Sequence, residues 1–199
     1  MKQFFLLVCI INSMLLCKAQ QHTITVHFLY GSVPAKGFEK TEKKKLGGKK
    51  GGHVTIETDD NIIGFQPKGT CHIFGEKKNA NGYFKAEPKE IWENDTVAAK
   101  YASVIIPVNY DQYTCVKNTF ENYLQKAPYD YAVFGMRCAA ASYDVLEKAG
   151  LVKKRSRFGK WVTYFYPQLL RRSLLKLAKE NNYAIVKHSG RNSRVWEKE

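Results

Sequence analysis

The stretch that decides the fold is Tyr129-Asp-Tyr-Ala-Val-Phe-Gly-Met-Arg-Cys-Ala-Ala-Ala-Ser-Tyr-Asp-Val-Leu-Glu-Lys-Ala-Gly150. Consecutive alanines favour a helix, apolar residues follow at helical spacing, and Gly150 is a typical residue just after a helix end. Cys138 therefore falls in the first turn of the predicted helix. There, unpaired backbone N–H groups and the helix dipole stabilise a thiolate, and Arg137 adds a positive charge. The position suits a nucleophilic cysteine, and equally a small buried thiol that helps the helix to pack.

Composition indicates a basic globular protein. The chain has 199 residues, 44% of them hydrophobic and 13% aromatic, and a formal net charge of +14. This length suits one domain, which we predict at residues 20–199, with a basic helix and strand extension at residues 152–199. The charge predicts attraction to polyanions such as anionic cell-envelope polymers, lipid headgroups or nucleic acid.

Residues 1–19 have the pattern of a cleaved secretory signal peptide. Lys2 is the positive start, an apolar run too short to span a membrane follows, and Cys17-Lys-Ala19 is a small-x-small cleavage site. A lipoprotein anchor on Cys17 is less favoured, because the preceding Leu16 is not small. We predict a secreted or periplasmic protein, a compartment that disfavours nucleic acid as partner. Loss of Lys2 and Lys18, with no acid removed, leaves a charge of +12.

After cleavage the chain keeps an odd number of cysteines, Cys71, Cys115 and Cys138. The simplest allocations are a Cys71–Cys115 disulfide or two buried thiols, with Cys138 free in both. A metal site that combines Cys71-His72 with Cys115 and His188 is disfavoured, because these spacings match no common zinc pattern. The sequence implies no metal and no cofactor.

A β-hairpin is predicted for Gly52-His-Val-Thr-Ile-Glu-Thr-Asp-Asp-Asn-Ile-Ile-Gly-Phe-Gln-Pro67, with its turn at the two aspartates. If Glu57 pairs with Ile62, His53 lies directly opposite Gln66 with their Cβ atoms roughly 5 Å apart. Glu57 is the chemically stronger partner for His53, but it lies four residues along the same strand, roughly 13 Å away. Gln66 is therefore the first candidate to orient the imidazole, with Glu57 in reserve. The same register predicts a core face of Val54, Ile56, Ile63 and Phe65.

The other elements follow from periodicity and capping patterns. The lysine- and glycine-rich residues 36–52 are predicted to be a solvated loop, or alternatively a lid, and residues 75–95 to be turns and loop. The basic helix is expected to pack on its own domain in preference to a membrane. Strands are predicted at residues 23–30, 70–74, 100–108, 161–166, 183–187 and 193–196, and the last two are expected to pair with each other. Helices are predicted at residues 109–126, with a cap formed by Asn109 and Gln112, and at residues 168–181, where Pro167 opens the helix.

Cys138, His53 and Gln66 together form the set that a cysteine hydrolase requires. The histidine takes the proton of the thiol and later donates it to the leaving group, while the third residue holds the ring. Each residue alone has a structural explanation. Their combination favours the catalytic interpretation.

Gly52-His-Val-Thr-Ile, a short hairpin, and much later Tyr129-Asp-Tyr with a helix opening at Cys138 resemble the permuted NlpC/P60 papain-like group, in which the histidine precedes the cysteine. The pattern is most similar to the YiiX-type permuted amidohydrolases and, more distantly, to lecithin:retinol acyltransferase-like proteins. The resemblance covers roughly Thr23 to Leu151. It implies an α+β papain-like fold in which an antiparallel sheet packs against helices that include the nucleophile helix.

The resemblance also implies thioester chemistry, in which Cys138 attacks an amide or ester carbonyl and His53 acts as base and then as acid. It implies a polar third residue, for which Gln66 is the candidate by position and Glu57 the reserve. The N–H of Cys138 would contribute to an oxyanion hole, and Tyr131 would add a hydroxyl there unless it belongs to the core. The implied substrates are peptide or amide bonds of cell-envelope material, then acyl-lipid esters, and both hydrolysis and acyl transfer remain open.

A different class of function also fits the sequence. The fold would then have lost its activity and serve as a secreted module that binds an anionic glycan or a membrane surface. The lysine-rich loop and the basic C-terminal helix would make the contact, and Cys138 would be structural.

Overall fold

The computed structural model describes residues 22–31, 33–34, 51–59, 61–78, 80–191 and 195–196. The predicted signal peptide and residues 36–50 of the lysine-rich segment lie outside these ranges. Within the described ranges, no helix is both long enough and apolar enough to cross a membrane.

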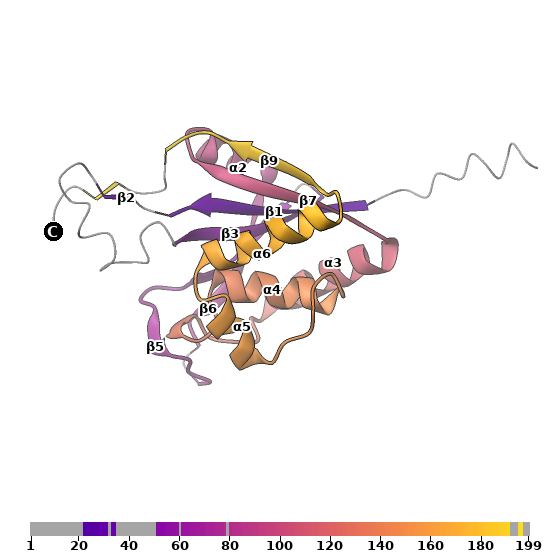
Figure 1. Cartoon of the computed structure of the whole chain (residues 1–199). Coiled ribbons are helices and arrows are strands. Elements are labelled where there is room, and N and C mark those ends of the chain that lie inside the picture. The colour runs from indigo at the N-terminus through magenta and orange to yellow at the C-terminus, as the bar shows by residue number, and fades with distance from the viewer. Residues whose placement is uncertain are drawn as a thin grey trace, which may run out of the picture.

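Six strands form one antiparallel sheet, in the spatial order β6 (Gly82–Pro88), β4 (Asn61–Pro67), β3 (Gly52–Thr58), β1 (His22–Tyr30), β7 (Tyr101–Val108) and β9 (Ala184–His188) (Figure 1). Two parallel pairs of short strands lie outside it, β5 (His72–Phe74) with β8 (Ala132–Phe134) and β2 (Val33–Pro34) with β10 (Val195–Trp196). Strands β3 and β1 are therefore the two central strands of the sheet.

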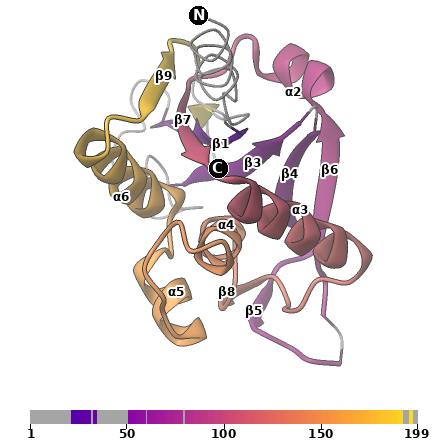
Figure 2. The ribbon, with the colours of Figure 1, turned by 90° about the vertical axis from the view of Figure 1, so that its right-hand side faces the viewer.

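Helices cover both faces of the sheet. They are α2 (Lys89–Thr96), α3 (Tyr110–Gln125), α4 (Cys138–Lys148), α5 (Arg157–Thr163) and α6 (Pro167–Glu180). Figure 2 shows the sheet curving around α4, with α3 and α6 on either side of that helix and α2 on the opposite face. The predicted α+β class with an antiparallel sheet is confirmed.

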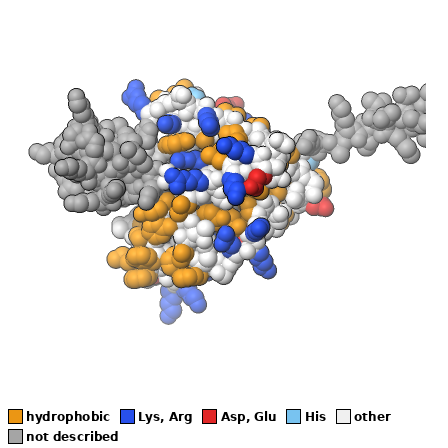
Figure 3. Space-filling view, viewed as in Figure 1, with side chains coloured by type: hydrophobic (Ala, Val, Ile, Leu, Met, Phe, Trp, Pro, Cys, Tyr) orange, Lys and Arg blue, Asp and Glu red, His pale blue; other side chains and the backbone are white. Residues whose placement is uncertain are grey.

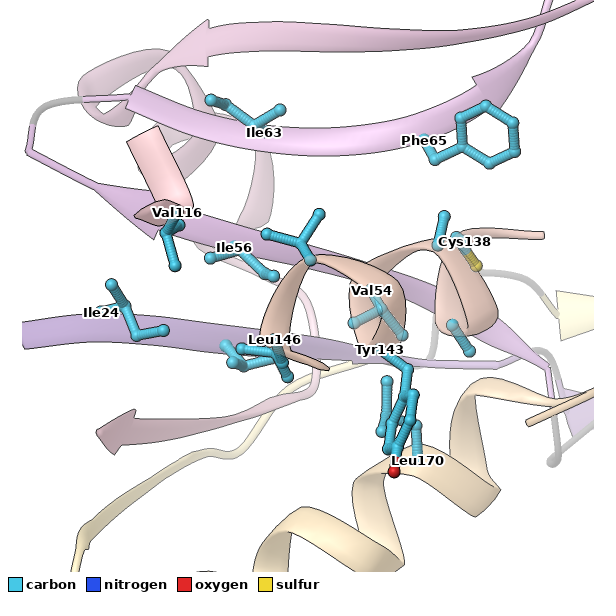
Figure 4. Close-up of a cluster of buried hydrophobic side chains, with 14 of the residues drawn as sticks. Ile24, Val54, Ile56, Ile63, Phe65, Val116, Cys138, Tyr143, Leu146 and Leu170 are labelled. Carbon is cyan, nitrogen blue, oxygen red and sulfur yellow. The ribbon is translucent and has the colours of Figure 1, made fainter. Parts of the chain in front are cut away.

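Helix α4 is the centre of the core. Its first nine residues are all buried, Val54 and Phe65 are fully buried on the strands that it crosses, and Leu146 packs from the helix (Figure 4). A helix enclosed on all sides must be small or apolar along its whole surface, which three consecutive alanines achieve. As predicted, Gly150 follows the helix with a φ of +70°, and its N–H donates to the carbonyl of Glu147 at 2.9 Å.

Several predicted boundaries are confirmed. The side chain of Asn109 accepts from the N–H of Gln112 at 2.8 Å, and Gln112 accepts from the N–H of Asn109 at 3.1 Å, so the expected capping box opens α3. Pro167 is the first residue of α6, as its fixed φ favours.

Three predicted elements are wrong. Residues 161–166 are not a strand, because Ser156 accepts from the N–H of Gly159 and starts α5, which runs to Thr163. Residues 75–95 hold strand β6 and helix α2 and not only turns. The expected pairing of 183–187 with 193–196 is replaced, because β9 joins β7 and β10 joins β2.

The proposed Cys71–Cys115 disulfide is also wrong, since all three described cysteines are free thiols. The sulfur of Cys71 lies 3.8 Å from the carbonyl oxygen of Tyr131, whereas that of Cys115 lies 3.4 Å from the carbonyl oxygen of Lys148. Different parts of the fold thus hold the two side chains.

We predict that Lys160→Ala lowers the free energy of unfolding by about 3 kcal/mol, because its removal leaves two carboxylates without their cation. Lys160 is 7% exposed, and its Nζ lies 2.5 Å from Asp144 and 2.9 Å from Glu147, both on α4. Urea denaturation measures the change. The control is Lys176→Ala, whose exposed pair with Glu180 should contribute less than about 0.5 kcal/mol. Equal effects of the two substitutions would contradict the prediction.

Candidate active site

Strands β3 and β4 separate at the end where the site forms. Their register is the predicted one, with Glu57 opposite Ile62, but the last pair is Thr55 with Gly64. Beyond this pair β4 continues along β6, while β3 remains paired with β1 back to Gly52. The sheet therefore opens between two neighbouring strands.

The N-terminus of α4 fills this opening. Cys138 is the first residue of the helix and 3% exposed, and its sulfur accepts a hydrogen bond from the N–H of Val54 on β3. Figure 4 shows Cys138 at the end of α4 that lies over Val54. No side chain caps the helix, so the thiol also faces the positive end of the helix dipole. The predicted position of Cys138 in the first turn is confirmed.

His53 precedes Val54 on β3 and interacts directly with Cys138. Burial alone would lower the pKa of His53, but the negative charge of Cys138 and a hydrogen bond to it raise that pKa above its ordinary value. Burial alone would raise the pKa of Cys138, but the charge and hydrogen bond of His53, the N–H of Val54 and the charge of Arg137 lower it. These opposite shifts favour a thiolate–imidazolium pair.

The second nitrogen of the His53 imidazole, Nε2, is buried and has no hydrogen-bond partner among the described residues. It faces Gly64 so closely that a Cβ built there would lie 2.8 Å from it. The glycine thus provides the space that the ring occupies. A glycine inside a strand pattern is a known sign of close approach, and this signal was available in the sequence.

Neither predicted third residue reaches His53. Gln66 lies on the part of β4 that has left β3, and its side chain accepts from the hydroxyl of Tyr83 at 3.5 Å. Glu57 accepts from Lys89 at 2.7 Å and bonds to Nε2 of His27 at 2.9 Å. Among the described residues the site is a Cys–His pair without an acidic or amide side chain to orient the imidazole, because the pairing of β3 and β4 ends before Gln66 comes opposite His53.

Tyr131 lies at the same helix end. Its ring stacks on Phe65 at 5.2 Å between centroids, and its phenol oxygen interacts with the backbone N–H of Cys138. Burial first, and then the negative charge of Cys138, raise the pKa of Tyr131 well above its ordinary value, so the phenol keeps its proton. The hydroxyl of Tyr131 and the N–H of Cys138 are therefore two neutral donors beside the thiol.

Arg137 precedes the cysteine and is held by aromatic residues. Its guanidinium lies 3.5 Å from the ring centroid of Phe165 and 5.6 Å from that of Tyr166, and it donates to the carbonyl of Phe165. Burial lowers the pKa of Arg137, while its interactions with Tyr131 and with Cys138 act in the opposite direction. Arg137 thus adds positive potential at the thiol, as expected.

A second constellation, which sequence reasoning missed, lies beneath α2. Nδ1 of His27 bonds to the hydroxyl of Ser103 at 2.8 Å, and Nε2 of the same ring bonds to Glu57 at 2.9 Å. Ser103 is 4% exposed, and the ring of Trp92 lies 4.4 Å from that of His27. A substrate has no access to this serine, so we assign the three residues to a hydrogen-bonded network that joins β1, β3 and β7.

The side chains of the disfavoured metal site are separated in the structure. His72 bonds to Asp130 at 2.7 Å, whereas His188 bonds to the carbonyl of Ala99 at 2.7 Å. Among the described residues, no group of three or more His, Cys, Asp or Glu side chains is placed to hold a metal ion.

No protein family profile and no curated protein sequence matches this chain. Among solved structures, the chain is similar to the crystal structure of TseH, a type VI secretion system effector. The TM-score is 0.53 with 8% sequence identity, over 84% of this chain and 99% of that chain. At this identity the likeness shows a related fold and nothing about the reaction.

We predict that Gly64→Ala slows alkylation of Cys138 by iodoacetamide at about pH 6 by roughly tenfold, because the added methyl displaces the imidazole that lowers the thiol pKa. The rate is measured by mass spectrometry in a background that lacks Cys71 and Cys115. The control is Gly75→Ala, where a Cβ meets nothing within 4 Å. Gln66→Ala should also have little effect. A Gly64→Ala protein as reactive as the parent would show that the ring tolerates the methyl.

We predict that the alkylation rate of Cys138 reaches half its maximum at a pH below the usual pKa of a cysteine, and that His53→Ala raises this pH. The sign follows from the lowered pKa of Cys138, because the thiolate is present above that pKa and burial alone would raise it. A pH series of alkylation rates measures both midpoints. Identical midpoints in the two proteins would disprove the coupling between the two residues.

Proposed function

We propose that this protein is a cysteine hydrolase of the permuted papain-like group that cleaves amide or ester bonds. One observation carries the proposal: the sulfur of Cys138 lies at the start of a buried helix and interacts with both His53 and the N–H of Val54. The fold similarity to a secretion effector is consistent with it. The predicted signal peptide and the charge of +12 that remains after its removal favour cell-envelope material as substrate, with amides first and acyl-lipid esters second.

In the proposed first step, the thiolate of Cys138 attacks the carbonyl carbon and a C–S bond forms. The carbonyl oxygen becomes an oxyanion, for which the N–H of Cys138 and the hydroxyl of Tyr131 are the donors. Both donors are fixed before the substrate arrives, one by the helix and the other by the stack of Tyr131 on Phe65. In the free protein the N–H of Cys138 is directed to the phenol oxygen of Tyr131, so the oxyanion takes over this hydrogen bond as it forms.

The imidazolium of His53 then gives its proton to the leaving amine or alcohol, and the C–N or C–O bond breaks. Neutral His53 next takes a proton from water, the hydroxide attacks the thioester, and the C–S bond breaks to release the acid and the thiolate. The raised pKa of His53 favours the donating form at the start of the cycle. An acceptor alcohol or amine in place of water would give acyl transfer by the same route.

We predict that the protein hydrolyses p-nitrophenyl acetate with an initial burst and carries an acetyl group on Cys138 that intact-mass analysis detects. Cys138→Ala should abolish both, and His53→Ala should lower turnover by about 10³-fold. Tyr131→Phe should lower it by about 10²-fold, because one oxyanion donor is lost. The control is Tyr83→Phe, which removes a hydroxyl that donates to the side chain of Gln66. An acetyl group on another residue, or a fully active Tyr131→Phe, would contradict these assignments.

A second candidate function is binding to an anionic membrane surface without catalysis, and an exposed apolar region favours it. This aromatic surface, visible at the lower left of Figure 3, surrounds a cavity of about 720 Å³ whose lining includes Lys77, Lys126 and Arg157. Aromatic residues beside cations are typical of membrane-contacting surfaces. The surface includes Phe74 (68% exposed) and Phe134 (49%), whose rings stack, and Phe158 (65%), whose ring contacts that of Trp161.

Sedimentation with vesicles that contain phosphatidylserine separates the two candidates. A pure binding module would bind such vesicles equally as the parent protein, Cys138→Ala and His53→Ala, and its Cys138 would be inert to iodoacetamide. A reactive Cys138 whose reactivity depends on His53 supports the hydrolase, whether or not the protein also binds the vesicles.

A further inference from the structure

Helix α6 contains a buried cation that the proposed mechanism does not use. Arg171 is 6% exposed, and its Nη1 atom is buried with no hydrogen-bond partner among the residues that the structure describes. Within the described residues it takes part in no ion pair. Arginine almost never occurs buried without an acidic or polar partner, so this side chain requires an explanation.

The surroundings of Arg171 are aromatic and basic. Its guanidinium lies 3.7 Å from the ring centroid of Tyr30, whose ring also has the Nζ of Lys100 at 5.0 Å. The charge of neighbouring Arg172 acts on it unfavourably, and no described carboxylate acts on it. Burial lowers the pKa of Arg171, the contact with Tyr30 acts in the opposite direction, and the charge of Arg172 lowers it further.

Arg171 lies at the same end of the sheet as the Cys–His pair. Tyr30, which it contacts, is the strand partner of Gly52, the residue before His53. Arg137, beside Cys138, rests on Phe165 and Tyr166, the two residues just before α6. In Figure 1 the N-termini of α4 and α6 and the ends of β1 and β3 lie at one side of the molecule.

The surface around α6 is also positively charged. Figure 3 shows Lys and Arg side chains outnumbering Asp and Glu over α6 and β9. The acid on α6 is Glu180 at its far end, where it pairs with Lys176. The field at the N-terminal end of α6 is therefore positive, with no described acid to neutralise it.

We infer that Arg171 forms an anion-binding position of the active site and takes a carboxylate or phosphate group of the substrate. A buried guanidinium nitrogen without a hydrogen-bond acceptor is unfavourable in the free protein, and a bound anion would supply the acceptor and an opposite charge, which the ring of Tyr30 does not. The planar guanidinium matches the two oxygens of either group. This inference rests on the proposed hydrolase and narrows its substrates to those with an anion near the scissile bond.

The binding test is thermal unfolding in sodium acetate or inorganic phosphate, each compared with chloride at equal ionic strength. The parent protein should show a saturable rise of the midpoint, about 3 °C near ten times the dissociation constant, with one anion. Acetate as that anion indicates a carboxylate substrate, and phosphate indicates a phosphate-bearing one. Arg171→Met should lose the rise, whereas the control Arg172→Met, an exposed neighbour on the same helix, should keep it.

The location test compares alkylation of Cys138 by iodoacetate, which is an anion, with alkylation by neutral iodoacetamide. Arg171→Met should lower the ratio of the two rates by up to about tenfold, because one nearby positive charge is lost. Arg172→Met should leave the ratio near that of the parent. Should Arg171→Met fail to fold, Arg171→Lys provides the comparison, since it keeps the charge but loses the paired donors and should bind the anion more weakly.

Three results would overturn the inference: no saturable rise in the parent protein with either anion, the same response in Arg171→Met and Arg172→Met, or a rate ratio that Arg171→Met leaves unchanged. The last result would show that the anion position does not belong to the site of Cys138. The rate of alkylation by neutral iodoacetamide tests the proposed hydrolase independently of the anion position. If that rate depends on His53 while the anion results are negative, the proposed function stands and only the anion position fails.

Discussion

The arrangement of the other elements follows from the burial of the first nine residues of α4. Over this length the helix crosses the concave face of the sheet and is also flanked by α3 and α6, so almost none of its surface reaches water. Its alanines allow close approach to β3 and β4, and its polar residue Asp144 requires internal partners. Tyr123 of α3 supplies one at 2.7 Å and Lys160 of α5 another at 2.5 Å. The central helix thus determines how its neighbouring helices attach.

The same burial creates the chemistry at the N-terminal end of α4. The first N–H groups of a helix have no intrahelical partner, and in a site shielded from water their dipoles act strongly on a nearby thiol. The separation of β3 and β4 adds the N–H of Val54, and Gly64 leaves room for the ring of His53. One helix end and one interrupted strand pair therefore provide most of the electrostatic environment of Cys138.

Sequence patterns predicted the elements that carry strong local signals. The capping box at Asn109, the proline that opens α6, the register of the β3–β4 hairpin and the place of Cys138 at a helix start all follow from a few neighbouring residues. Residues 161–166 are rich in β-formers, yet they begin in a helix because Lys160 binds two carboxylates of α4. Strand β6 was not predicted, because Phe84 is its only buried residue and the strand therefore shows no clear alternation of apolar and polar side chains.

Short segments of the chain were enough to identify the candidate residues for the chemistry, because a cysteine at a helix start and a histidine on a strand are local properties. The tertiary structure decided which of them meet. In the fold His53 lies next to Cys138. Gln66 pairs with β6 and lies away from β3, because the pairing of β3 and β4 stops at Gly64. Where a strand pair ends, and which buried charge is left without a partner, depends on contacts between distant segments, and local propensity contains no information about them.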